Sequence, residues 1–111
     1  MIEIVFVNYL NKYLSVPSSL ERPDKSIKKF ILIEKTGGSK SNHISSATFV
    51  FQSYALSLYE AAVLNEELKQ VVENMIELDE ISSIKLNSDY NFTDTQTKEY
   101  RYQAVFDIKH Y

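Results

Sequence analysis

The chain contains no cysteine and no tryptophan, and it has only two glycines and two prolines among 111 residues. The absence of cysteine excludes disulfides, thiolate metal sites and a cysteine nucleophile. So few glycines and prolines argue against a disordered linker or a low-complexity tail. No apolar run reaches the ~18–20 residues that a membrane-spanning helix needs, so we expect no membrane association. The composition therefore predicts one soluble domain over residues 1–111.

The charge is mildly acidic: 12 Lys and Arg stand against 15 Asp and Glu, a net charge of −3. A general nucleic-acid binder usually carries a basic surplus, so this balance argues against that class. Hydrophobic residues make up 44% of the chain, which suffices for one core without disulfide support. The eight Tyr and six Phe favour strands and wet interfaces, where a tyrosine presents an apolar ring and a polar tip.

Hydrophobic spacing predicts the elements of the first half of the chain. Apolar residues at three- and four-residue steps indicate a helix over about 2–14, which Pro17 ends. The segment 18–22 lies between two prolines, and we expect a short edge strand there. Residues 30–33 are a strand covered on both faces, and 36–39, which hold both glycines, are expected to turn or open a loop.

The second half begins with a strand over about 44–54. Ser57 and Glu60 then form a capping box that opens a helix extending to about residue 77. Ile81, Ile84 and Leu86 suggest a further strand, followed by a polar loop over 87–97. Residues 100–111 alternate between apolar and polar side chains, which predicts a strand buried on one face and antiparallel to its neighbour.

These elements predict an α+β fold in the order α-β-β-β-α-β-β. Its sheet is single and mostly antiparallel, with four to five strands and both helices packed on one face. The residues expected to form most of the core are Phe30, Leu32, Phe49, Phe51, Leu64, Leu68, Val71, Val72, Phe106 and Ile108, with several of Val5, Phe6 and Leu10 against them.

No motif for catalysis, a cofactor or a metal is found in the sequence. Neither His43 nor His110 has an acid or a second histidine at metal-ligand spacing. The pair Gly37-Gly38 with Lys40 lacks the first glycine and the Ser/Thr of a phosphate-binding loop. The acids on and after the second helix are typical of a solvated face. We therefore predict a protein that is not an enzyme and has no cofactor.

Three segments, in this order, resemble the tail terminator (tail completion) proteins of long-tailed bacteriophages. The first, 30–38, is similar to their strand that ends in an (Arg/Lys)-Thr-Gly-Gly turn, and the second, 47–55, is similar to the next strand before the long helix. The third, 100–108, resembles their closing strand with its Arg-Tyr-Gln-Ala sequence. The similarity covers about residues 27–111, and the helix and Val16-Pro17 turn before it fit the same plan.

The resemblance implies a structural virion protein, located in the tail or neck and made in the host cytoplasm. Such proteins form a ring, commonly of six subunits, on the last disc of the tail tube. The ring stops tube polymerisation and provides a docking surface for the head connector. The expected partners are therefore other copies of the chain, the major tail tube protein and the head connector. DNA passes through the lumen, where an absence of excess positive charge is sensible because basic residues would hold the phosphates.

Two alternatives remain open at this stage: another phage neck or head-completion protein of related fold, and a small non-catalytic protein-binding module. A ring subunit presents two different surfaces to its neighbours. The free subunit is expected to be monomeric. Tyr100 and Tyr102 are assigned to the interface, with packing on the helices as the alternative. The residues predicted at the subunit or tail-tube interface are Thr36, Gly37, Gly38, Lys40, Asn42, Leu20, Arg22, Tyr100, Tyr102 and Tyr111.

Overall fold

The structure, a computed structural model, describes residues 2–111. It is elongated, with principal extents of 44 × 24 × 22 Å. Its elements are α1 (Ile2–Tyr13), β1 (Ser18–Ser19), β2 (Phe30–Ser41), β3 (Ile44–Ala55), α2 (Leu58–Asn74), the 3-10 turn η1 (Met75–Glu77), β4 (Ile81–Asn91) and β5 (Tyr100–His110).

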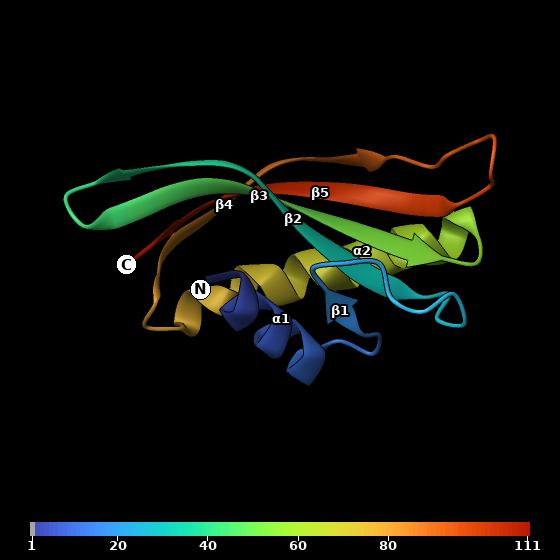
Figure 1. Cartoon of the computed structure of the whole chain (residues 1–111), viewed down its shortest axis with the longest axis horizontal. Helices are drawn as coiled ribbons and strands as arrows, with labels where there is room; N and C mark the ends of the chain where they lie inside the picture. The colour runs from blue at the N-terminus through green and yellow to red at the C-terminus, as the bar shows by residue number, and fades with distance from the viewer. Residues whose placement is uncertain (1) are drawn as a thin grey trace.

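The five strands form one sheet in the order β1-β2-β3-β5-β4. The two-residue β1 runs parallel to β2, and all other neighbours are antiparallel. Both helices cover the same face of this sheet (Figure 1). The predicted α+β class, the element order and the short edge strand after the first helix are thus confirmed.

Local sequence signals explain where the second helix begins. The Ser57 hydroxyl accepts a hydrogen bond from the backbone N–H of Glu60 at 3.2 Å, which satisfies one of the free amides of the first turn. The same hydroxyl donates to the Glu60 carboxylate at 3.3 Å. The predicted cap is therefore confirmed, although the carboxylate bonds the serine hydroxyl and not the serine backbone N–H of an ideal capping box.

The core lies between the sheet and the two helices. Phe6 of α1 meets Phe49 of β3 edge-on, with ring centroids 4.8 Å apart, and Phe51 meets Phe106 of β5 in the same way at 5.8 Å. The buried cluster comprises Phe6, Tyr9, Leu10, Leu14, Ile31, Ile33, Ala47, Phe49, Phe51, Leu64, Leu68, Val72, Met75, Ile81, Ala104, Phe106 and Ile108. Most of the predicted core residues are among them.

The core prediction was only partly right for the first long strand, where Phe30 is buried but lies outside the cluster beneath the helices. Ile31 and Ile33 of β2 face the helices, whereas Phe30 points to the other face of the sheet and stacks on Tyr54 at 4.5 Å. Leu32 is only partly buried. An unbroken apolar run carries no alternation, so it does not reveal which residues face which side. Val71 and Val5 are likewise only partly buried at the rim of the helices.

The two predicted loops were also placed wrongly. Residues 36–39 belong to β2, and the chain turns at Asn42 and His43, which have φ angles of 51° and 67°. Two consecutive residues with positive φ form the tight connection of a two-residue hairpin. Residues 87–91 continue β4, so the connection to β5 begins only at Phe92. Polar composition suggested loops here because the arm extends beyond the helices, while β4 meets α2 at this level through polar contacts of Asp89 with Asn65 and Lys69.

Candidate interaction surfaces

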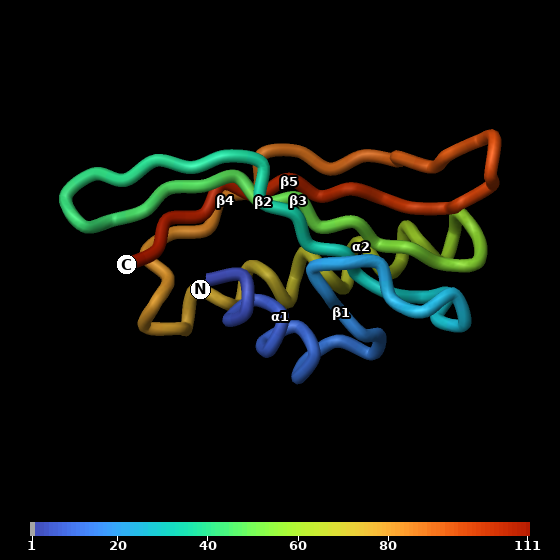
Figure 2. Tube along the Cα trace, in the orientation of Figure 1, coloured from blue at the N-terminus to red at the C-terminus, as the bar shows by residue number. Residues whose placement is uncertain are grey.

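The hairpin of β2 and β3 extends past the end of the helices as an arm, here defined as residues 34–48 (Figure 2). Residues 34–43 are all exposed, and the segment contains no hydrophobic side chain. Strand pairing nevertheless continues to the tip, where Ser41 lies opposite Ile44. The arm is therefore ordered by its backbone hydrogen bonds while its side chains are left free for contacts.

The two glycines of the arm lie within the strand, and neither has a positive φ. A register shift between Lys35 and Gly37 marks a β-bulge, where Thr36 donates its hydroxyl to the Thr48 carbonyl at 3.3 Å. A Cβ added to Gly37 would meet nothing within 4 Å, whereas one added to Gly38 would come within 3.2–3.4 Å of Lys35, Ser46 and Ala47. Gly38 thus serves packing within the arm, and the fold of the chain does not require a glycine at position 37.

At the opposite end of the sheet, charged and aromatic side chains converge on Tyr54. Arg22 forms an ion pair with Glu99 at 2.6 Å and donates to the Tyr54 hydroxyl at 3.2 Å. Arg101 of β5 donates to the same hydroxyl at 2.9 Å, and its guanidinium lies 4.7 Å from the Phe92 ring centroid. These contacts tie the segment after β1 and the β4–β5 loop to the sheet.

The Arg22–Glu99 ion pair holds two segments of the chain together and is poorly suited to proton transfer. The hydrogen bond from Arg22 holds the pKa of Glu99 below its usual value, and the same bond raises the pKa of Arg22. Both groups therefore stay charged near neutral pH, where a proton-transfer catalyst needs a pKa close to the working pH. Beside the pair lies a groove of about 450 Å³, with Lys25, Lys28 and Lys98 on its rim.

The sheet face opposite the helices carries a chain of polar contacts. Gln52 donates to Gln103 at 2.8 Å, and Gln103 donates to the Tyr90 hydroxyl at 2.6 Å. Further toward the arm, Thr48 donates to Asp107 at 2.9 Å, and Asn87 donates to the other oxygen of that carboxylate at 3.1 Å. These two hydrogen bonds hold the pKa of Asp107 below its usual value, and the bond from Asn87 has the larger effect.

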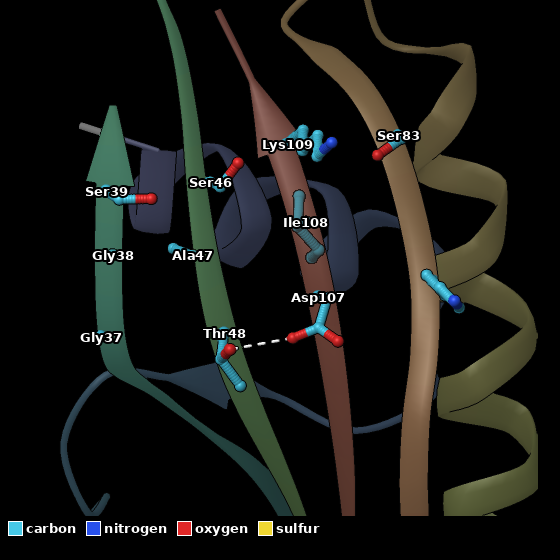
Figure 3. A pocket seen from close by; sticks show the side chains of 11 residues that line it. Gly37, Gly38, Ser39, Ser46, Ala47, Thr48, Ser83, Asp107, Ile108 and Lys109 are labelled. Carbon is cyan, nitrogen blue, oxygen red and sulfur yellow. Dashed lines mark hydrogen bonds between the residues drawn. The ribbon is translucent and has the colours of Figure 1, made fainter. Parts of the chain in front are cut away.

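A second, shallow hollow of about 560 Å³ lies on this face, between the base of the arm and β4 (Figure 3). Thr48 and Asp107 stand in its floor, and the arm residues Gly37, Gly38 and Ser39 form one wall. Ser83 and Lys85 of β4 form the opposite wall. The Thr48 hydroxyl and the Asp107 carboxylate in its lining bond each other, and the lowered pKa of Asp107 makes that carboxylate a weak base, so the chemistry of the hollow suits recognition of polar groups.

Most of the ten predicted interface residues gather at the two ends of the molecule. Thr36, Gly37, Gly38 and Lys40 line the arm, and Asn42 is at its tip. Tyr111 is 69% exposed and follows His110, which pairs with Ser45 of the arm. Leu20, Arg22 and Tyr100 lie toward the other end, with Leu20 37% exposed and Tyr100 lining the groove beside the ion pair.

Tyr102 follows Arg101 in β5, where it is half-buried and pairs with Ser53 and Asn91. Tyr100 is also half-buried. The residues that sequence reasoning missed are Tyr54, Glu99, Arg101 and Gln103, which organise the face without helices. The alternation of polar residues in β5 was a sequence signal for Arg101 and Gln103 only, and their meeting with Tyr54 and Glu99 depends on strand pairing.

An apolar patch at the start of α2 was also missed. Leu56, Tyr59 and Val63 are 60%, 78% and 49% exposed, respectively. Tyr59 and Val63 are four residues apart and therefore share one side of the helix. Large exposed side chains next to one another are unusual on a monomer and are typical of a contact surface.

Within residues 2–111, no group of three or more His, Cys, Asp or Glu side chains is arranged to hold a metal ion. None of the helices in this range has the length and apolar character required to cross a membrane. A scan against models of known protein families and a search of curated proteins both found no match to this chain.

Proposed function

We propose that this chain is a structural virion protein of a long-tailed phage that forms a ring at the head-proximal end of the tail tube. The ring ends tube polymerisation and provides the surface to which the head connector docks. The observation that carries this proposal is the arm, which projects past the helices with ten consecutive exposed residues, 34–43. The β3 side of the arm pairs with β5, but its β2 side has no neighbouring strand beyond Leu32 in the described chain, and a long exposed strand edge of this kind can pair with a partner.

The distribution of surfaces supports the proposal. The arm lies at one end of the long axis, and the Arg22–Glu99 groove and the Leu56–Tyr59–Val63 patch lie toward the other. Two unlike surfaces at separate positions allow each subunit to contact a different surface of the next, and such head-to-tail contacts close into rings when the rotation fits. The element order also agrees with the plan that the sequence resemblance implies.

The test shortens the arm without disturbing the core. Residues 39–46 are replaced by Asn-Gly, a two-residue hairpin turn that joins the paired residues Gly38 and Ala47. The matched control is His43→Gly, which keeps the whole arm and changes only its turn. We expect both variants to fold, because the deleted residues lie outside the buried cluster.

In the phage that encodes the chain, the shortened arm should give overlong or headless tails by electron microscopy, and the control should give normal tails. Tails of normal length that join heads normally would refute the assignment. Normal tail length with failure of head joining would instead indicate a neck or head-completion protein of related fold. A chain that binds neither tails nor heads would indicate the non-catalytic binding module.

A further inference from the structure

The sheet has two free edges, one on each side. β1 pairs with β2 only at Ile31 and Leu32, so within the described chain the outer edge of β2 is unpaired from Ile33 to Ser41. β4 pairs with β5 alone, so its outer edge is free from Ile81 to Asn91. Unpaired edges present rows of backbone donors and acceptors that can accept another strand.

We infer that the edge of β2 in one copy of the chain pairs with the edge of β4 in the next copy. The inference rests on the ring of the proposed function and states how its subunits join. The strand directions permit this contact. β2 runs opposite to β3, β3 opposite to β5, and β5 opposite to β4. A neighbouring copy with the same orientation therefore places its β2 antiparallel to β4 and keeps its helices on the same face.

The register can be followed across the sheet. Gly38 pairs with Ala47, Ala47 with Ile108, and Ile108 with Ile84, so these four residues lie in one row. The next row, toward the tip, contains Ser39, Ser46, Lys109 and Ser83. Two copies at the same level thus bring Ser39 beside Ser83. The β2 segment beyond its bulge, 37–41, then faces the start of β4, whose unbulged stretch runs from Ser83 to Leu86.

Side-chain size agrees with this pairing. The free edge of β2 contains Gly37, Gly38 and Ser39, and that of β4 contains Ser82 and Ser83. The fold of the subunit leaves open space beside Gly37. A glycine within a strand that has no positive φ and no crowding of its own often marks close approach of another backbone. In the inferred contact, the backbone that approaches Gly37 is that of β4 in the neighbouring copy.

The distribution of charge favours pairing of β2 with β4 over pairing of β2 with the β2 of a second copy. At the same register, Lys40 lies next to the start of β4, which follows the exposed Asp79 and Glu80. Glu34, aligned with Ser88, lies diagonal to Lys85 on the face opposite the helices. In a two-fold pairing of β2 with itself centred on the glycines, Lys35 and Lys40 of the two copies face each other. Like charges at that position oppose such pairing.

Disulfide trapping tests the contact in purified protein, and the natural absence of cysteine gives a clean background. Ser39→Cys and Ser83→Cys proteins are mixed at millimolar concentration and oxidised. Paired strands bring Cα atoms about 4.5–5.5 Å apart, within the range that a disulfide spans. Within one subunit these positions are three strand spacings apart, about 14 Å, which prevents an internal bond.

We expect a covalent dimer from the mixture, and a ladder of oligomers from the S39C/S83C double variant whose largest closed member reports the ring size. Gly37→Cys and Ser41→Cys, each paired with Ser83→Cys, cover a register slip of two residues, which barrel-like closure can introduce. Thr95→Cys with Ser83→Cys is the matched control, because Thr95 is exposed in the β4–β5 loop.

If Ser39→Cys protein cross-links to itself and the mixture contains no dimer that joins Ser39→Cys to Ser83→Cys, the pairing is symmetric and the inference is overturned. It would also be overturned if none of the three arm positions gave more cross-linked protein than the Thr95 control. If the cross-links form but tail length is unchanged in the shortened-arm phage, the proposed function fails and the subunit contact stands. If the cross-links fail while tails become overlong, only the contact between edges is wrong.

Discussion

Substitution of Leu68 by alanine tests the packing of α2 on the sheet. Leu68 has no exposed surface and belongs to the cluster beneath the helix, which packs mainly on β3 and β5. The substitution removes three carbon atoms, and their transfer to water costs roughly 2.4 kcal/mol at ~0.8 kcal/mol per methylene. The remaining cavity adds to this cost because a close-packed core relaxes only in part. We expect a loss of about 3–4 kcal/mol in the free energy of unfolding.

Urea unfolding, followed by the far-ultraviolet circular dichroism of the helices, measures this loss. Domains of this size have a total stability of roughly 5–15 kcal/mol and a urea slope of about 1–3 kcal/mol per molar. The midpoint for Leu68→Ala should therefore fall by roughly 1–4 M with an unchanged slope. The control is Val63→Ala in the same helix, where the valine is 49% exposed and the loss should stay below about 1 kcal/mol. Equal midpoints for the two variants would refute the placement of the helix on the sheet.

Three further predictions follow from local geometry. His43→Gly should raise the free energy of unfolding by about 0.5–1 kcal/mol in urea melts, because a positive φ of 67° costs ~1–2 kcal/mol in a non-glycine residue and glycine returns part of that as backbone entropy. Ser53→Ala should raise the free energy of unfolding by up to about 1 kcal/mol in thermal melts, because the buried Ser53 hydroxyl has no hydrogen-bond partner among the described residues. A loss of stability above about 1 kcal/mol would show that the hydroxyl has a partner. Glu99→Gln should remove a stabilisation of less than about 1 kcal/mol, since Glu99 and Arg22 are partly exposed. Because the folded pKa of Glu99 is lowered, the wild type should exceed this variant above pH ~4.5, and the difference should vanish as pH falls through the folded pKa; a constant difference would contradict the ion pair.

The secure parts of the sequence prediction were those in which a local signal acts by itself. Ser57 and Glu60 specify the start of α2 through bonds between near neighbours, and the stripe containing Leu64, Leu68 and Val72 specifies its buried side. The alternation in β5 specified Ala104, Phe106 and Ile108 as the buried residues. In each case the periodicity of one element carries the information, and no partner needs to be known.

The predicted turn at the glycines failed for an identifiable reason. A glycine permits a positive φ but does not require one, and here both glycines lie in an extended strand while Asn42 and His43 make the turn. Asparagine and histidine are enriched at positive φ among non-glycine residues, so their adjacency was a signal that the two glycines obscured. The polar stretches 36–41 and 87–91 were similarly assigned to loops because neither has an apolar alternation, although the first pairs with β3 and the second with β5.

The amino-acid sequence by itself determined the α+β class, the order of the elements, the two amphipathic helices and the buried side of β5. These depend on spacing along the chain, which is set by helical and strand geometry. Only the tertiary structure decided which face of β2 is covered, how far the arm projects, and that Arg22, Tyr54, Glu99 and Arg101 meet. The reason is that strand pairing and side-chain contacts bring together residues far apart in the chain, up to 77 positions for Arg22 and Glu99. Such contacts depend on three-dimensional closure, and no local pattern encodes them.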